Sequence, residues 1–265
     1  MPSGSIDIDP ADGFSCVEIG HGPPLILFPG MARKPVTSGL AYAGLARISN
    51  RRIHVVNRPR GLPRGLTMSD LAAQHAQFLS ERFAGSIDLL GISTGGALAL
   101  QLAVDHHDLV NRLIVVAAAS WLGDEGRKKL RAFGDEIGHG RSGAKVLASV
   151  LASRTWAWAA VPMLWLAHQL ERGANPNDML ATIDAEVAFD VTSRLSRIRA
   201  ATLLIAGARD RGFPLALVEA TAAGIPHSQL IVYPRAGHVG TMLNRQFGRD
   251  VAAFLGAAAK QEAPT

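Results

Sequence analysis

The sequence predicts an α/β fold in which a mostly parallel central sheet is covered by helices on both faces. Short apolar runs of strand length alternate with longer stretches of helical pattern along most of the chain. One of these strands runs into a helix through a tight Gly-Ile-Ser-Thr-Gly turn at residues 91–95. A long helical stretch without strand signals then separates the apolar run that ends near Ala119 from the one that begins near Ala201. These three observations indicate one α/β unit that carries a helical insertion.

The N-terminal half is expected to begin with a β-hairpin. Residues 5–9 and 14–19 alternate between apolar and polar side chains on either side of a Pro-Ala-Asp-Gly turn. After it we expect strands at 24–28, 52–56 and 86–90, a helix from about 39 to 48, and a helix that Thr67 or Ser69 caps and that runs to about Phe83. The Pro- and Gly-rich residues 57–65 are expected to form a loop.

The C-terminal half continues the alternation of strands and helices. We expect helices from Thr94 to about His106 and from about 247 to 259, and strands at 112–118, 201–206 and 229–233. Residues 121–190 lie between two of these strands and carry helical pattern only, so we interpret them as an inserted helical cap. Residues 1–120 and 191–265 then form the α/β core.

Length and composition agree with a single core-forming domain. The chain has 265 residues, of which 48% are hydrophobic and 18% are charged, which suffices for one substantial core and argues against wholesale disorder. Its formal net charge is +5, but the arginines are scattered and no recognition motif accompanies them, so we do not expect a nucleic-acid partner. The only cysteine, Cys16, excludes an intramolecular disulfide, and the first residues lack signal-peptide regions, so we expect a cytoplasmic location.

The turn at residues 91–95 carries the strongest candidate for chemistry. Ser93 lies between a strand and a helix, and the glycines two positions before and after it allow such a sharp turn to close. The turn exposes the hydroxyl at the carboxyl edge of the sheet, where open α/β sheets bind ligands. The Gly-x-Ser-x-Gly pattern is similar to the turn that carries the nucleophile in α/β-hydrolases. A plain Gly-rich turn is the alternative interpretation, but the apolar strand before it and the Ala- and Leu-rich helix after it favour the resemblance, which implies that Ser93 is a nucleophile.

A serine nucleophile needs a base that takes its proton and a third group that orients this base. His238 follows the last expected strand and is the candidate base. Asp210 follows the strand at 201–206 and is the candidate acid, with Asp124, after the preceding strand, as the main alternative. The rival histidines fall at a helix end, in the cap or before the last strand; they are His106, His107, His139, His168 and His227.

Backbone N–H groups are expected to stabilise the negative charge that acyl transfer places on the carbonyl oxygen. The first donor should be the amide of Thr94, the residue after the candidate nucleophile. The second should come from the loop after the strand at 24–28, where Met31 is the candidate. A simple turn at Pro29 and Gly30 is the alternative.

Together these segments resemble the α/β-hydrolase superfamily, in the esterase- and lipase-like branch that has a serine nucleophile and a helical cap. The segments that carry the resemblance are residues 20–31, 58–61, 91–95, 207–210 and 237–238. The resemblance implies the order nucleophile, acid, base along the chain. Two positions depart from the family pattern, since Pro29 stands where the family often has His and Asn57 where it often has Asp. A serine nucleophile argues against epoxide hydrolases and haloalkane dehalogenases, which use a carboxylate.

The apolar residues of the expected cap suggest a substrate pocket more than a membrane span. The most apolar stretch, residues 146–170, is interrupted by Arg154, Pro162, His168 and Gln169. Several large side chains in it can wall an apolar acyl or ring-bearing substrate, and the candidates are Trp156, Trp158, Met163 and Trp165. Packing of the cap onto the core is an equally weighted alternative, and docking on a membrane surface is a third.

The leading functional hypothesis is hydrolysis of a carboxylic ester or lactone of a small, largely apolar substrate through an acyl-enzyme on Ser93. We expect no metal or other cofactor, because the sequence has no Cys/His cluster with ligand spacing. Carbon–carbon hydrolysis, thioester cleavage, acyl transfer and cofactor-free perhydrolysis use the same machinery and stay open. A small-molecule receptor on a hydrolase scaffold is the alternative from another class. The sequence leaves the oligomeric state open.

Overall fold

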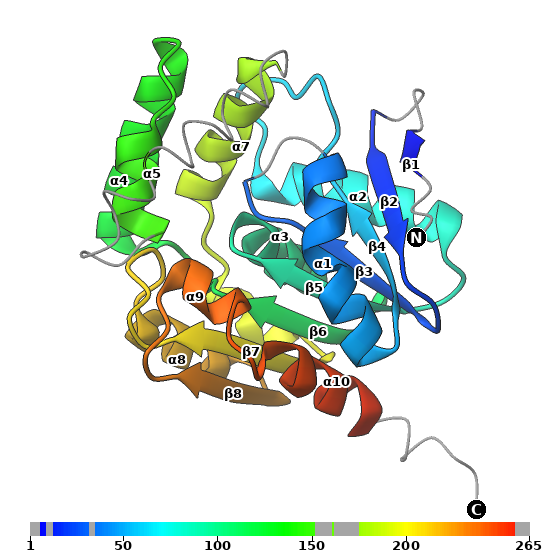
Figure 1. Cartoon of the computed structure of the whole chain (residues 1–265). Coiled ribbons are helices and arrows are strands. Elements are labelled where there is room, and N and C mark those ends of the chain that lie inside the picture. Colours follow the sequence, from blue (N-terminus) through cyan, green and yellow to red (C-terminus); the bar gives the residue numbers. More distant parts are fainter. Residues whose placement is uncertain (1–5, 9–12, 32–34, 152–160, 162–174, 258–265) are drawn as a thin grey trace, which may run out of the picture.

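A computed structural model describes residues 6–8, 13–31, 35–151, 161 and 175–257 of the chain (Figure 1). The described residues form one eight-stranded sheet with the order β1-β2-β4-β3-β5-β6-β7-β8. Strand β1 (Ile6–Ile8) pairs antiparallel with β2 (Ser15–Ile19), and β2 pairs antiparallel with β4 (Arg52–Val56). All other neighbouring strands are parallel. The predicted α/β fold with a mostly parallel sheet is therefore confirmed.

The strand bounds follow the apolar runs of the sequence closely. The remaining strands are β3 (Pro24–Phe28), β5 (Ile87–Ile92), β6 (Val110–Val116), β7 (Ala201–Gly207) and β8 (Ser228–Tyr233). The helices of the core are α1 (Pro35–Ser49), α2 (Met68–Arg82), α3 (Thr94–Asp105), the 3-10 helix η1 (Thr192–Arg197), α8 (Leu215–Gly224), α9 (His238–Met242) and α10 (Phe247–Ala257). One expectation was wrong in detail, because α1 begins earlier than residue 39. The short helix that His238 opens was not expected.

Helices cover both faces of the sheet, and the alternation along the strands assigns side chains to the two faces (Figure 1). On one face, Leu25 and Leu27 of β3 belong to a buried cluster that includes residues of α1 and α10. On the other face, Ile26 and Phe28 belong to a second cluster with residues of α2, α3 and α8. The start of α2 is fixed by a capping box, in which Thr67 and Asp70 each bond the other's backbone N–H.

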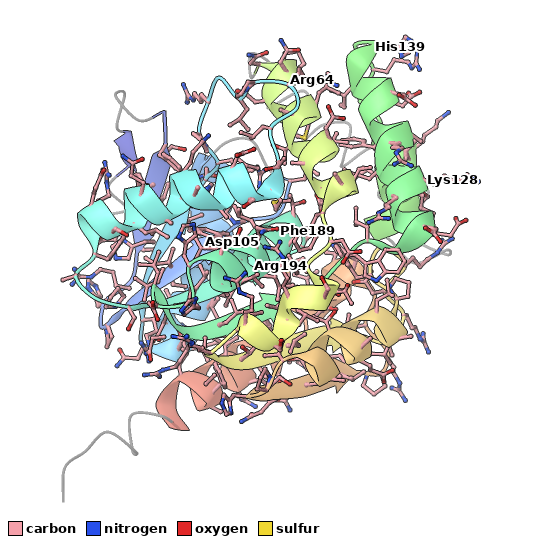
Figure 2. The ribbon with its side chains drawn as sticks, turned by 180° about the vertical axis from the view of Figure 1, so that it is seen from behind. Arg64, Asp105, Lys128, His139, Phe189 and Arg194 are labelled. Atoms are coloured by element: carbon pink, nitrogen blue, oxygen red, sulfur yellow. The ribbon has the colours of Figure 1, made fainter. Side chains whose placement is uncertain are left out.

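A partly exposed ion pair holds η1 against the end of α3. Figure 2, which views the molecule from behind, shows Arg194 and Asp105 close together, and their Nη1 and Oδ1 atoms lie 2.8 Å apart. Asp105 also accepts hydrogen bonds from Ser69 at the start of α2 and from Gln101 of α3. The residues that follow the helical insertion are thereby anchored to the core.

Among the described residues, the α-helices of residues 121–190 lie on the side of the carboxyl ends of the parallel strands (Figure 1). They are α4 (Gly123–Gly138), α5 (Ala144–Leu151) and α7 (Pro176–Ala188), and they share a separate buried cluster that includes Phe133 and Ile183. Trp121 and Asp190 form an isolated antiparallel bridge, so the two ends of the expected cap lie side by side. Among the helices of the described residues, none is long and apolar enough to cross a bilayer.

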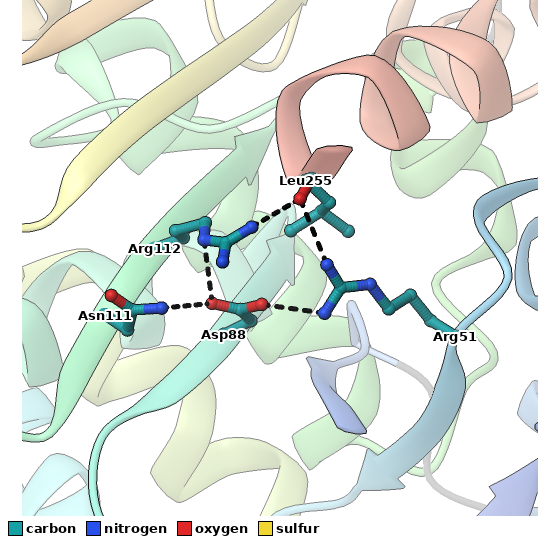
Figure 3. A network of polar contacts seen from close by, with 5 residues as sticks. All are labelled: Arg51, Asp88, Asn111, Arg112 and Leu255. Atoms are coloured by element: carbon teal, nitrogen blue, oxygen red, sulfur yellow. Dashed lines mark hydrogen bonds and ion pairs between the residues drawn. The ribbon is translucent and has the colours of Figure 1, made fainter. Parts of the chain in front are cut away.

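A buried polar network lies at the amino ends of the parallel strands, opposite their carboxyl ends (Figure 3). The carboxylate of Asp88, at the start of β5, accepts a hydrogen bond from Arg51 at 2.9 Å and one from Asn111 at 3.0 Å. Arg112 lies 3.4 Å from the same carboxylate. Both arginines also donate to the backbone carbonyl of Leu255, which fastens the last turn of α10 to the sheet.

We expect Asp88→Ala to lower the free energy of unfolding by about 3–5 kcal/mol, because two nearly buried guanidinium groups lose their counter-charge. The midpoint of urea unfolding measures this loss. Asp108→Ala is the matched control: its carboxylate is paired with Arg199 and the two side chains are 84% and 70% exposed, so its loss should stay below about 1 kcal/mol. Equal shifts for the two variants would contradict the stabilising role of Asp88.

Candidate active site

Ser93 occupies a strained turn between β5 and α3. Its backbone has φ 54° and ψ −122°, in a region that non-glycine residues rarely adopt. The Ser93 N–H donates to the carbonyl of Val116 on the neighbouring strand at 2.9 Å, and the Ser93 carbonyl accepts from the Gly96 N–H at 2.7 Å. These bonds hold the serine at the carboxyl end of β5, on the side where the helical insertion stands.

The glycines around Ser93 are required by close packing. A Cβ added at Gly91 would lie 2.7 Å from the Cβ of Ala99, and one added at Gly95 would lie 2.6 Å from the carbonyl oxygen of Pro29. A Cβ on Gly96 would lie 2.6 Å from the Cβ of Ala118. The turn therefore closes only because its flanking positions have no side chains, as the sequence pattern indicates.

The structure brings the three predicted site residues together. His238 Nε2 lies 2.9 Å from Ser93 Oγ, and His238 Nδ1 lies 2.8 Å from Asp210 Oδ2. The second oxygen of Asp210 accepts the backbone N–H groups of Gly212 at 2.8 Å and Phe213 at 3.0 Å. Asp210 thus has both oxygens engaged, and its orientation toward the imidazole is fixed by its own loop.

The alternative site residues lie elsewhere. Asp124 is exposed in the first turn of α4, so Asp210 is the carboxylate that contacts His238. Arg209 and Arg211, on either side of it, are exposed, and His139 and His227 are exposed as well. The four expected pocket residues, Trp156, Trp158, Met163 and Trp165, lie outside the described residues, as does His168.

The loop after β3 passes directly beside the serine. A Cβ placed on Gly30 would lie 3.6 Å from the Cβ of Ser93. Arg58 donates from both terminal nitrogens to the Gly30 carbonyl, each at 3.1 Å. In a trans peptide the carbonyl and the following N–H point in opposite directions, so Arg58 also sets the direction of the Met31 N–H. In the sequence, Arg58 was noted only as part of the loop at residues 58–61, and its contact with Gly30 was not predicted.

Glu186 is a site residue that sequence reasoning missed. It comes from the last turn of α7, is only 2% exposed, and receives a hydrogen bond from the side chain of Thr94. Its Oε2 has no hydrogen-bond partner among the described residues. Burial raises the pKa of Glu186 to about 7, although the Thr94 bond and the charges of Arg58 and His238 act in the opposite direction.

A signal for Glu186 was present in the pattern of its helix. Met179 and Ile183 are buried at helical spacing, and Glu186 continues the same face, where an apolar residue is expected. A carboxyl group on a buried stripe is costly unless it is paired or has a function. A search of the sequence for charged residues that interrupt an apolar helix face would have identified Glu186.

We expect Glu186→Gln to change how stability depends on pH. The pKa of Glu186 is about 7 in the folded protein against an ordinary value of 4.5, so the folded state keeps a proton that the unfolded state loses, and stability falls as pH rises across this window. Glutamine has no proton to lose. At pH 8 the variant should be more stable than the wild type by about 2–3 kcal/mol, and near pH 4 the two should agree.

Urea unfolding of both proteins at several pH values measures this difference. Glu219→Gln, at an exposed position of α8, is the matched control and should follow the wild type at every pH. A difference between Glu186→Gln and the wild type that does not grow with pH would contradict the assignment.

Comparisons with known proteins agree with this fold. A family model described as "Alpha/beta hydrolase family" matches residues 25–254. The chain belongs to the alpha/beta hydrolase family and is a hydrolase.

Two curated relatives are similar over most of their length. The pimeloyl-[acyl-carrier protein] methyl ester esterase of Nitrosomonas europaea is 26% identical over 234 residues, which is 83% of this chain and 90% of the relative. The putative carbamate hydrolase RutD of Variovorax paradoxus is 26% identical over 238 residues, 84% of this chain and 85% of the relative.

Solved structures are similar over nearly the whole chain. A hydrolase from Pseudomonas aeruginosa PA01 has a TM-score of 0.77 at 21% identity and covers 96% of this chain and 98% of its own. A thermophilic esterase from Thermogutta terrifontis has a TM-score of 0.74 at 22% identity and covers 98% of this chain and all of its own (100%). At these identities the likeness concerns the fold.

Proposed function

We propose that the protein is a serine hydrolase that cleaves a carboxylic ester or lactone of a small, largely apolar substrate. The observation that carries this proposal is the unbroken hydrogen-bond chain from Ser93 through His238 to Asp210. A hydroxyl, an imidazole and a carboxylate in this order are the groups that acyl transfer needs.

In the proposed acylation step, Asp210 holds the proton on Nδ1 of His238, so that Nε2 offers its lone pair to the Ser93 hydroxyl. The serine oxygen bonds to the carbonyl carbon, its proton moves to Nε2, and the carbonyl oxygen becomes an oxyanion. The amides of Thr94 and Met31 stabilise this charge by about 3–4 kcal/mol per donor. The imidazolium then gives its proton to the leaving alcohol as the carbon–oxygen bond breaks.

Deacylation repeats these steps with water. His238 takes a proton from the water while the water oxygen bonds to the acyl carbon, and the Ser93 oxygen leaves with that proton. The products are a carboxylic acid and the free enzyme. Asp210 stays ionised throughout and stabilises the imidazolium in both halves of the reaction.

The names of the relatives support ester cleavage and add carbamate cleavage as a second candidate. One relative is a methyl ester esterase, and another is a putative carbamate hydrolase. Both reactions expel a group from a carbonyl carbon, so the same site residues serve either. We further propose that residues 121–190 form a cap on the core of residues 1–120 and 191–265, and that Trp156, Trp158, Met163 and Trp165 wall the pocket. A cytoplasmic location remains a prediction.

Labelling with a fluorophosphonate probe tests the proposed nucleophile. The wild type should be labelled within minutes, Ser93→Ala should not be labelled, and mass spectrometry should place the adduct on the peptide that contains Ser93. A series of p-nitrophenyl esters of increasing chain length then reports the depth of the pocket. A folded wild type that stays unlabelled, or equal labelling of Ser93→Ala, would overturn the proposal.

A further inference from the structure

Glu186 contacts the candidate site through Thr94, and the mechanism above does not use it. Three parts of the site act on its carboxyl group: Thr94 through a hydrogen bond, Arg58 through its charge, and His238 through its charge when protonated. Thr94 follows the proposed nucleophile, and Arg58 holds the loop that carries Met31. The carboxyl group therefore contacts the turn that carries Ser93 and lies within the electrostatic reach of Arg58 and His238.

The position of Glu186 relative to a substrate follows from its contact with Thr94. The Thr94 amide is the proposed donor to the substrate carbonyl, and the Thr94 side chain bonds Glu186. One residue thus bridges the reacting carbonyl and the buried carboxyl group, so groups within a few bonds of that carbonyl are the ones that come near Glu186.

The oxygen atom Oε2 of Glu186 is not used in the contacts described so far. Within the described part of the chain it has no hydrogen-bond partner, and the residue is 2% exposed, so water does not replace the missing partner at the surface. A buried polar atom without a partner is rare in folded proteins, and a ligand group that pairs with it is one explanation. If the only task of this residue were to hold Thr94, one polar atom would suffice.

We propose that Glu186 selects the substrate, its Oε2 forming a hydrogen bond with a hydroxyl group within a few bonds of the scissile carbonyl. This inference rests on the proposed function, because it places an ester at Ser93. A hydroxyl suits the site because it can both donate and accept, and a carboxyl group accepts when ionised and donates when protonated. The preferred substrates are then hydroxylated esters, and purely alkyl esters of the same size leave Oε2 without a partner.

Pairs of esters of equal size test this selection. Methyl glycolate and methyl propionate differ by a hydroxyl in place of a methyl group on the acyl side, and 2-hydroxyethyl acetate and propyl acetate differ in the same way on the alcohol side. Proton release during hydrolysis gives kcat/KM for each. The wild type should prefer the hydroxylated member of at least one pair by about tenfold or more, because a site built for a hydrogen bond rejects an analogue that lacks it.

Glu186→Leu removes the carboxyl group while it keeps a similar volume. The preference should fall to about one, and the loss of kcat/KM should be about tenfold larger for the hydroxylated ester than for its alkyl partner. The melting temperature at pH 8 should not decrease, since an apolar side chain suits this buried position. Glu186→Gln should keep part of the preference. Glu219→Leu, on the exposed side of α8, should leave both rates and the preference unchanged.

The outcomes separate this inference from the proposed function. If the fluorophosphonate labels Ser93 but the wild type shows no preference in either pair, or Glu186→Leu keeps the preference, Glu186 does not select the substrate. If Glu186→Leu lowers both rates equally and also lowers the melting temperature, Glu186 is a structural tie between α7 and Thr94. If the probe does not label Ser93 and no ester is hydrolysed, the proposed function fails and this inference fails with it.

Discussion

Ser93→Ala is expected to lower kcat by about 10⁶-fold, because the hydroxyl supplies the bond to the acyl carbon and neither His238 nor Asp210 can replace it. Removing the nucleophile of such a hydrogen-bonded set costs about as much as removing all three members. The residual rate should still exceed the rate in water, because the Thr94 and Met31 amides remain. Hydrolysis of a p-nitrophenyl ester measures kcat directly.

The strain at Ser93 supplies the control for this prediction. Alanine has the same backbone strain as serine at φ 54°, so Ser93→Ala should keep the wild-type melting temperature. Glycine adopts this conformation freely, so Ser93→Gly should be equally inactive and more stable by about 1 kcal/mol. An alanine variant that retains one hundredth of the wild-type kcat would show that Ser93 is not the nucleophile.

Asp210→Asn is expected to lower kcat by about 10⁴-fold through the wrong imidazole tautomer. One oxygen of Asp210 accepts the N–H groups of Gly212 and Phe213, so the amide oxygen of asparagine will take that position. Its NH₂ group then faces Nδ1 of His238 and makes this nitrogen an acceptor. The proton moves to Nε2, which can no longer accept the proton of Ser93.

Asp124→Asn is the matched control for this change. The residue is exposed in the first turn of α4, and its substitution should leave kcat within about twofold. Steady-state kinetics at pH 7–8 measure both variants. A loss below tenfold for Asp210→Asn, or an equal loss for Asp124→Asn, would contradict the role of Asp210.

The core strands could be predicted well because each is a short apolar run bounded by turn residues. The expected strand at 52–56 coincides with β4, and the expected strand at 24–28 coincides with β3. Helix ends were harder to predict. Helix α1 begins at Pro35, a residue favoured in the first turn of a helix, but Pro-Val-Thr-Ser also resembles a loop. Helix α9 spans only His238–Met242 and is too short to show helical periodicity.

Some residues of the candidate site could be predicted from the local sequence, and others could not. Ser93, Asp210 and His238 each follow an apolar strand, and parallel strands bring their carboxyl ends to one edge of the sheet. Arg58 has no such signal, and the helical pattern around Glu186 indicates only that it is buried, because the partners of both residues lie far away in the chain. Their roles arise from tertiary packing, which depends on how the loop and the helical insertion settle on the core.

The bridge between Trp121 and Asp190 has a consequence for how this protein can vary. Because the insertion leaves and rejoins the core at neighbouring points, its length can change without moving β6 relative to β7. Ser93, Asp210 and His238 follow strands of the sheet, whereas Glu186 belongs to α7 within the proposed cap. A chimaera that carries the corresponding segment of another family member would inherit a new preference and retain the old chemistry.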